Sequence, residues 1–266
     1  MSALEETTSA GRVRLEIDGH VGTLVLDRPR KQNALTPEML RELDGHLQAI
    51  EADDALWAVA LRGAGGRAFC AGADIRRFAG LSSVAMWRSW TALGHTVFER
   101  LARLRQPVIA VVHGNAFGGG LELALAADFR IVAEHALVGL PEAGLGTVPG
   151  WGGTERLVEV IGRARAKEIV LARRILDGET AQSWGLATRA VPADTLEASL
   201  RELLDQVLAG APLAVQVAKQ LIDAAADGAP SRILEPLAAG LTAATSDLTE
   251  GVAAFRERRA PAFQGR

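Results

Sequence analysis

The sequence predicts an α/β fold that ends in a helical segment. Between residues 12 and 191, stretches with strand character alternate with amphipathic helices, as in layered α/β domains. Residues 107–112 (PVIAVV) are a short, continuously apolar run, which favours a strand buried on both faces. After Val191 and Pro192 every periodic segment has helical spacing, and no strand candidate remains. We therefore expect a core of strands and helices followed by helices alone.

The first elements are a hairpin and a helix. Residues 12–17 and 21–26 alternate apolar and polar side chains on either side of a DGH turn, which indicates paired strands. Residues 27–33 are polar and predict a loop. Thr36 and Pro37 are typical of an N-cap and a first helical residue. The side chains that this helix is expected to bury recur at helical spacing: Met39, Leu40, Leu43, Leu47 and Ile50.

The middle of the chain continues the alternation. In chain order we expect a strand at 57–61, a glycine-rich stretch at 63–72, a helix at 84–104, a helix at 121–126 and a strand at 128–132. The longer helix is expected to end before Pro107, because the residue that precedes a proline disfavours the helical conformation.

The C-terminal part is expected to contain helices only, at 193–209, 213–227, 231–244 and 246–258. We accordingly predict a flexible N-terminus at 1–11, an α/β core at 12–192 and a helical segment at 193–266. The helical segment is too thin to own a core, so it is expected to pack on its own domain or on a neighbouring subunit.

Composition excludes several classes of protein. The formal net charge of −3 does not favour nucleic acid or an anionic membrane as a partner. Cys70 is the only cysteine, which fits a reducing compartment. The N-terminus lacks the features of a signal peptide, and the longest apolar runs are too short to span a bilayer. A cytoplasmic location is expected.

Two glycine-rich stretches are candidates for binding a ligand through the backbone. In residues 67–75 (RAFCAGADI), small side chains let the main chain approach a ligand and leave N–H groups free. Taken alone, this stretch is better explained as an ordinary turn. Residues 114–122 (GNAFGGGLE) place three glycines before a helix start, where free N–H groups and the helix dipole favour a negative charge. The second stretch is not a G-x-G-x-x-G fingerprint, and the chain has no Walker-type loop.

Two glutamates accompany these stretches. Glu122 lies in the first turn of the predicted helix, where pairing with the helix dipole is the simpler explanation. Glu142 lies in a mostly apolar loop at 140–154 (LPEAGLGTVPGWGGT), where burial raises the pKa of a carboxyl group toward neutrality; a solvent-facing glutamate is the alternative. Two sets of backbone donors and two carboxylates can together stabilise an enolate while a proton and a water move.

In order and spacing, these stretches resemble the motifs of the crotonase superfamily, the enoyl-CoA hydratase/isomerase family. Residues 68–75 look like its first oxyanion-hole motif, residues 118–123 like its second and residues 141–154 like its catalytic loop. The hairpin, the DRP tripeptide at 27–29 and the NAL tripeptide at 33–35 are similar to its N-terminal signature. The resemblance implies a crotonase-like spiral of β-β-α units with a helical C-terminal trimerisation segment, and a homotrimer or a dimer of trimers.

The resemblance also implies roles for individual residues. The backbone N–H groups of Ala73 and Gly119 would bind the thioester carbonyl oxygen, while Glu122 and Glu142 hold a water and move a proton. How the two glutamates divide these roles stays open, because one water connects them. The residues implied to contact the acyl-CoA are Ala71, Asp74, Ile75, Arg76 and Gly150, with Arg28 and Lys31 near the nucleotide end. For Arg28 and Lys31, solvated loop charges are nearly as good an explanation. No metal is implied, and no cofactor apart from the coenzyme A of the substrate.

The function that follows is enoyl-CoA hydratase: reversible addition of water to a 2-trans-enoyl-CoA, giving a 3-hydroxyacyl-CoA, in fatty acid or related acyl-CoA catabolism. A double-bond isomerase is one alternative, but isomerases commonly manage with a single acid/base. A catalytically silent acyl-CoA-binding subunit is another. Hydratase-lyases of hydroxycinnamoyl thioesters use a tyrosine, and this chain has none. Trp151 stands where a small residue is common, which suggests a shorter acyl pocket; simple loop packing is the alternative.

Overall fold

Two sheets form the centre of the fold in the computed structural model, which describes residues 11–266. Apart from Gly11, the flexible terminus predicted at 1–11 lies outside the described residues. The larger sheet has six strands in the spatial order β1 (Arg12–Asp18), β2 (Val21–Asp27), β3 (Ala58–Gly63), β5 (Val108–Val112), β7 (Phe129–Ala133) and β9 (Arg189–Val191). The predicted hairpin β1–β2 is antiparallel, and the other neighbouring pairs are parallel.

The smaller sheet is not predicted by the sequence patterns. It consists of three short parallel strands in the order β4 (Ala68–Cys70), β6 (Asn115–Phe117) and β8 (Val138–Gly139). Strands of two or three residues are too short to show a period of two, which explains why no pattern marked them. Each follows a strand of the large sheet, in the pairs β3–β4, β5–β6 and β7–β8, and helices come next along the chain. This repetition confirms the predicted spiral of β-β-α units.

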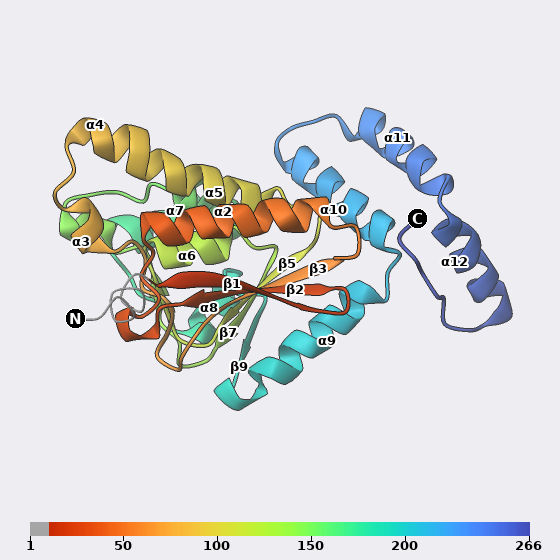
Figure 1. Ribbon diagram of the computed structural model, residues 1–266, viewed down its shortest axis with the longest axis horizontal. Coiled ribbons are helices and arrows are strands. Elements are labelled where there is room, and N and C mark those ends of the chain that lie inside the picture. Colours follow the sequence, from red (N-terminus) through yellow and green to blue (C-terminus); the bar gives the residue numbers. More distant parts are fainter. Residues whose placement is uncertain (1–10) are drawn as a thin grey trace.

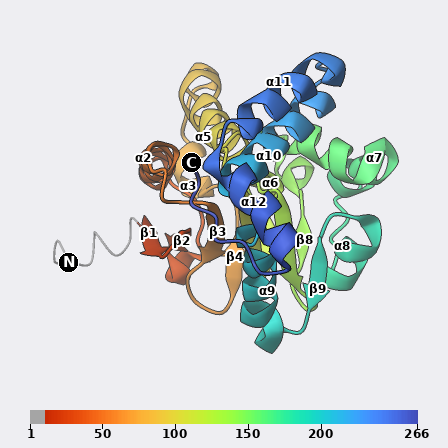
Figure 2. The same cartoon turned by 90° about the vertical axis from the view of Figure 1, so that its right-hand side faces the viewer.

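Helices cover both faces of the large sheet. Figures 1 and 2 show α2 and α5 along one face and α9 along the other. The helices of the core are α2 (Pro37–Ala52), α3 (Ile75–Phe78), α4 (Ser83–Ala85), η2 (Met86–Thr91), α5 (Ala92–Ala102), α6 (Gly119–Leu125), α7 (Gly153–Leu171) and α8 (Gly178–Trp184), with the short 3-10 turns η1 (Pro29–Lys31) and η3 (Glu142–Leu145). Those after the last strand are η4 (Ala193–Thr195), α9 (Leu196–Leu208), α10 (Pro212–Ala226), α11 (Ser231–Ala243) and α12 (Ser246–Glu257).

Helix α2 has the predicted cap and the predicted buried face. The Oγ1 atom of Thr36 accepts a hydrogen bond from the N–H of Met39 (3.2 Å), and Pro37 is the first helical residue. All five side chains expected to be buried are 0% exposed. The cap is worth about 1 kcal/mol, and burial of each large aliphatic side chain about 1.5–3 kcal/mol. The apolar face therefore does more than the cap to hold α2 against the hairpin.

Two predicted helices differ in detail from the structure. The expected helix at 84–104 begins at Ser83, passes through the π-helical segment η2 and ends at Ala102. Its wider turns depart from the 3.6-residue period that the prediction used. Helix α6 begins at Gly119 rather than residue 121, because Gly118 adopts a φ of 53° that turns the chain into the helix.

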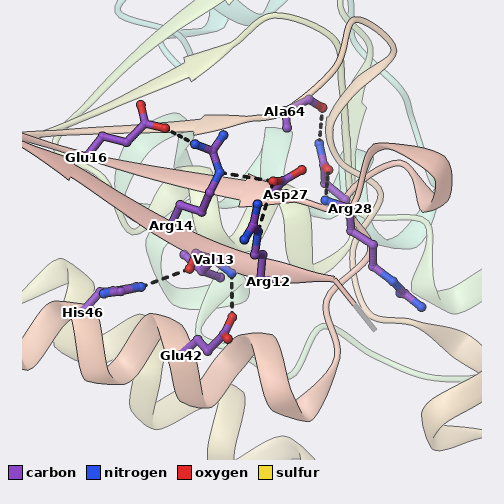
Figure 3. A network of polar contacts seen from close by, with 10 residues as sticks. Arg12, Val13, Arg14, Glu16, Asp27, Arg28, Glu42, His46 and Ala64 are labelled. Atoms are coloured by element: carbon purple, nitrogen blue, oxygen red, sulfur yellow. Dashed lines mark hydrogen bonds and ion pairs between the residues drawn. The ribbon is translucent and has the colours of Figure 1, made fainter. Parts of the chain in front are cut away.

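The hairpin is held on α2 by polar contacts as well as by its core. Figure 3 shows α2 contributing Glu42, which accepts the N–H of Val13 (2.7 Å), and His46, whose Nε2 lies 3.0 Å from the Val13 carbonyl oxygen. On the outer side, Arg14 donates to Asp27 across the two strands (3.1 Å). These contacts hold β1 on α2 and join it to Asp27, the last residue of β2.

The C-terminal helices are unlike the rest of the fold. Helix α9 buries part of one face, whereas α11 has no buried residue. Figure 1 shows α11 and α12 at one end of the molecule, beyond α10. Large apolar side chains are exposed along these helices: Ile233, Leu237, Leu241, Leu248 and Phe255. The last strand ends at Val191, but the division of roles at residue 192 stays a prediction. Within residues 11–266, no helix has both the length and the apolar character needed to cross a bilayer.

Candidate active site

The three candidate segments meet at one edge of the small sheet. Residues 71–74 follow β4, Gly118 and Gly119 follow β6, and residues 140–142 follow β8. The strands are parallel neighbours, so their carboxyl ends lie at the same edge. Ligands of open parallel sheets bind outside this edge. The small sheet therefore brings together motifs that are far apart in the chain.

Two backbone N–H groups lie next to each other at this edge. Gly119 is the first residue of α6, so its N–H has no partner inside the helix. A Cβ atom built on Gly119 would lie 3.5 Å from the nitrogen of Ala73, and one built on Gly72 would lie 3.1 Å from the nitrogen of Gly119. Within residues 11–266, neither N–H donates a hydrogen bond. The pair can bind one acceptor oxygen of a ligand.

A buried asparagine holds the first of these segments in place. Asn33 is 0% exposed and adopts a φ of 56°, and its Nδ2 donates to the carbonyl oxygens of Ala64 and Ala68 (both 2.9 Å). Close by, the N–H of Leu35 donates to the Gly72 carbonyl oxygen (2.8 Å). The NAL tripeptide at 33–35 marked Asn33 only as part of the resemblance, without a structural role; the tolerance of asparagine for the left-handed region is a further signal.

Glu122 is held by the start of another helix. Its Oε1 accepts hydrogen bonds from the N–H groups of Trp151 (2.8 Å) and Gly153 (3.0 Å), and Gly153 is the first residue of α7. Gly152, at a φ of 92°, turns these two N–H groups toward the same oxygen. The side chain is 3% exposed; burial raises the pKa of Glu122, and the hydrogen bonds oppose that rise. The carboxylate thus pairs with the N-terminus of α7 and not only with the dipole of its own helix.

Glu142 has no such support. Both of its carboxyl oxygens are shielded from solvent, and within residues 11–266 neither has a hydrogen-bond partner. A Cβ atom built on Gly118 would lie 3.0 Å from Oε1, which places the carboxyl group beside the second glycine-rich segment. Burial, with the nearby charge of Glu122 adding to it, raises the pKa of Glu142 to about 7. A carboxyl group with this pKa can give or take a proton at neutral pH.

Trp151 forms a wall of the site. Its side chain is 3% exposed and packs with Trp90 and Phe98, at ring-centroid distances of 5.4 Å and 5.2 Å. Gly94 and Gly119 leave room for the indole, because a Cβ atom on either glycine would overlap it. Loop packing is therefore a real role of Trp151. The same ring also fills space directly beside the N–H of Gly119.

Two of the predicted CoA-contacting residues bind each other. The Nη1 of Arg28 lies 2.7 Å from Oδ2 of Asp74 and donates to the Ala34 carbonyl oxygen (3.0 Å). Their side chains are 7% and 14% exposed. The explanation of Arg28 as a solvated loop charge is therefore wrong. The pair joins the N-terminal loop to the first glycine-rich segment. Contact of either residue with a nucleotide stays a prediction.

The other predicted contacts face outward or line the rim. Ile75 is 50% exposed. Arg76 and Lys31 are also exposed, whereas Ala71 and Gly150 are half-buried. Ala71, Ile75 and Arg76 flank Ala73, Gly150 lies in the loop that follows Glu142, and Lys31 lies in η1 of the N-terminal loop. The contacts of these five residues with a ligand stay predictions.

Comparison with known proteins places this geometry in a family. The family model of enoyl-CoA hydratases and isomerases matches residues 16–266. A short-chain-enoyl-CoA hydratase of Clostridium acetobutylicum is 36% identical over 93% of this chain and 95% of that protein. A crotonyl-CoA hydratase of Syntrophomonas wolfei subsp. wolfei is also 36% identical, over 94% of this chain and 96% of that protein. The crystal structure of an enoyl-CoA hydratase from Bacillus anthracis superposes with a TM-score of 0.91 at 37% identity, covering 96% of this chain and 100% of that one. The chain belongs to the enoyl-CoA hydratase/isomerase family.

Proposed function

We propose that the protein adds water reversibly to a 2-trans-enoyl-CoA and forms a 3-hydroxyacyl-CoA. The observation that carries this proposal is the pair of glutamates beside two free backbone donors. The Glu122 carboxylate accepts hydrogen bonds from two N–H groups, whereas the carboxyl oxygens of Glu142 are shielded from solvent and have no hydrogen-bond partner within residues 11–266. Hydration needs one carboxylate to take a proton from water and one carboxylic acid to supply a proton. We assign the carboxylate to Glu122, which has N–H donors, and the carboxylic acid to Glu142.

The backbone donors act on the thioester. Its carbonyl oxygen accepts hydrogen bonds from Ala73 and Gly119 and gains negative charge as water adds to Cβ. Donors that are fixed before the reaction stabilise this charge without reorganisation, and loss of one typically costs ~10²–10³ in kcat. The closeness of the two nitrogens at the sheet edge supports this role.

The glutamates move the atoms of water. Oε2 of Glu122, the oxygen not bonded to Trp151 or Gly153, holds the water and takes one of its protons. The hydroxide part forms the new C–O bond at Cβ, and Glu142 gives its proton to Cα. The pair begins and ends with one proton between them, so both directions require the same total protonation state.

The acyl group is proposed to be short. Trp151, backed by Trp90 and Phe98, fills the space beside Gly119 where the carbon chain of a bound thioester begins. Comparison of kcat/KM for enoyl thioesters of four to sixteen carbons tests this. A sharp decline with length is expected, and equal turnover of the longest and shortest substrates would contradict it.

Assembly and cellular role complete the proposal. Exposed apolar side chains on α11 and α12, such as Leu237 and Phe255, support packing against other copies in a trimer or a dimer of trimers. Light scattering after gel filtration would show a mass three or six times that of the chain. We place the reaction in cytoplasmic fatty acid β-oxidation or a related acyl-CoA pathway. The chemistry uses carboxyl and backbone groups and calls on no metal or redox cofactor.

The hydratase proposal is tested with crotonyl-CoA. Loss of the conjugated thioester absorbance is expected for the purified protein, and a Glu142→Gln variant should abolish it. A 3-enoyl-CoA is supplied in parallel, because an isomerase would convert it to the conjugated form. Conversion of the 3-enoyl thioester without hydration of crotonyl-CoA would favour the isomerase. Binding of acyl-CoA with neither reaction would favour a silent subunit.

A further inference from the structure

Arg156 contacts the loop that holds Glu122 from the side opposite to the carboxylate. It lies in the first part of α7, and its Nη1 donates to the carbonyl oxygen of Trp151 (3.1 Å). The N–H of the same residue, Trp151, donates to Oε1 of Glu122 (2.8 Å). Trp151 thus has its N–H on the carboxylate and its carbonyl on the guanidinium.

A glutamate from another helix fixes Arg156 in turn. Oε2 of Glu99, on α5, accepts from Nη2 of Arg156 (2.5 Å), so the two ends of the guanidinium bind two different partners. The Arg156 side chain is 12% exposed. The Glu99 side chain is 42% exposed, so the contact is shielded on the arginine side only. The forked contact is geometrically specific, because the guanidinium is planar and its donors point in fixed directions.

The charged chain continues outward but weakens there. Arg103 bonds Glu99 (2.9 Å) and Asp227 (2.7 Å), yet the side chains of Arg103 and Asp227 are 52% and 51% exposed. Ion pairs at such exposure contribute about 0–1 kcal/mol. In this chain of ion pairs, therefore, only Arg156 and Glu99 can act on the site.

We propose that Arg156, held by Glu99, is a positioning residue that fixes Glu122 through the backbone of Trp151. The proposal rests on the role given to Glu122 in hydration. Without the guanidinium, the Trp151 carbonyl loses a charged donor, and the backbone on both sides of the Trp151 Cα can shift. The hydrogen bond from the Trp151 N–H to Oε1 then weakens, and the carboxylate moves from the water. No sequence pattern marks this role, because Arg156 and Glu99 are 57 residues apart.

The charges around the pair bear on the test. Glu142 faces Glu122, and the positive charge of Arg156 lowers the pKa of Glu122 against the opposing effect of burial. The titratable and charged groups near Arg156 and Glu99 are His95 and Arg103 beside Glu99, Glu155 and Glu159 on α7, and Asp227 at the end of α10. Substitutions at residue 156 leave all of these groups unchanged. The lysine variant keeps the positive charge without the forked geometry of the guanidinium, and the glutamine variant removes the charge.

The experiment compares Arg156→Gln, Arg156→Lys and Glu99→Gln with wild type, using crotonyl-CoA. Arg163→Gln, at an exposed arginine of α7 that lies beyond the kink at Gly162, is the matched control. We expect kcat to fall roughly 10- to 10²-fold in Arg156→Gln with little change in KM, as for a misplaced catalytic group. The acid limb of its pH profile should move to higher pH, because Glu122 becomes easier to protonate. Arg156→Lys should lose kcat but keep the pH profile.

Two further readouts separate this role from simple stability. The double variant Glu99→Gln/Arg156→Gln should have the same kcat as Arg156→Gln, because each single substitution breaks the same contact between residues 99 and 156. A ¹³C-glutamate NMR titration, assigned with Glu122→Gln, should show a higher pKa for Glu122 in Arg156→Gln. An unchanged kcat and an unchanged Glu122 pKa in Arg156→Gln would overturn the proposal. An inactive wild type would instead overturn the hydratase proposal, and the titration would still decide the role of Arg156.

Discussion

Glu122 and Glu142 occupy one site but are built into it in opposite ways. Glu122 comes from α6 and is held by two N–H groups at the start of α7, which in turn are braced by Arg156. Glu142 comes from the 3-10 turn after β8, and its carboxyl oxygens have no hydrogen-bond partner among residues 11–266. Both are shielded from solvent, so burial alone does not distinguish them; the supply of N–H donors does.

The contrast explains how two identical side chains can do different chemistry. Burial raises the pKa of both carboxyl groups. At Glu122 the hydrogen bonds from N–H groups oppose that rise, whereas neither carboxyl oxygen of Glu142 has a hydrogen-bond partner among residues 11–266. The charge of Glu122 also helps to raise the pKa of Glu142. The site therefore favours a single proton shared unequally by the pair.

The strongest test of the contrast removes the proton of Glu142. Glu142→Gln is expected to lower kcat for crotonyl-CoA roughly 10²–10⁴-fold, the range for loss of a general acid/base. The fold should survive, because glutamine has the same shape and no charge to bury. Steady-state kinetics and a thermal melt measure both effects. Glu179→Gln, an exposed glutamate on α8, is the control and should match wild type.

Glu122→Gln should lower kcat about 10²-fold or more, because the water loses its base. Its amide oxygen can still accept from Trp151 and Gly153, so KM should change little. The measurement is kcat and KM for crotonyl-CoA. A variant that raised KM with an unchanged kcat would mean that Glu122 binds substrate rather than water.

The coupling between the two groups gives a smaller effect. In the wild type, kcat/KM should decline as the pH rises through about 7, where Glu142 loses its proton. In Glu122→Gln the charge that raises the pKa of Glu142 is gone, so the decline should begin at lower pH. A pH profile of the residual activity checks the direction. A shift to higher pH would contradict the assigned coupling.

The smallest effect is on stability. Burial raises the pKa of Glu142 from 4.5 to about 7, so the folded state binds a proton more tightly than the unfolded state. The stability that this proton provides is fully present below pH 4.5 and is lost as the pH rises through about 7. The melting temperature of wild type minus that of Glu142→Gln should therefore be larger at pH 5 than at pH 8. A difference independent of pH would show that Glu142 titrates normally in the folded protein.

How far the sequence predicted this molecule depends on the range of the interactions. The face and cap of α2 follow from local periodicity, and the structure confirms them at Thr36 and at the five buried side chains. The small sheet was missed, because its strands have two or three residues. The motifs named both glutamates, yet their difference depends on N–H groups 29 and 31 residues away from Glu122. Asn33 and Arg156 act through similarly distant contacts, which no local pattern encodes.

The most direct test of the central claim follows the atoms of water. Crotonyl-CoA is incubated with the protein in H₂¹⁸O, and the product is analysed by mass spectrometry beside the Glu142→Gln variant. The account predicts rapid formation of 3-hydroxybutyryl-CoA with ¹⁸O on the carbon β to the thioester, and almost none from the variant. Unchanged crotonyl-CoA with the wild type, or full activity of the variant, would contradict it.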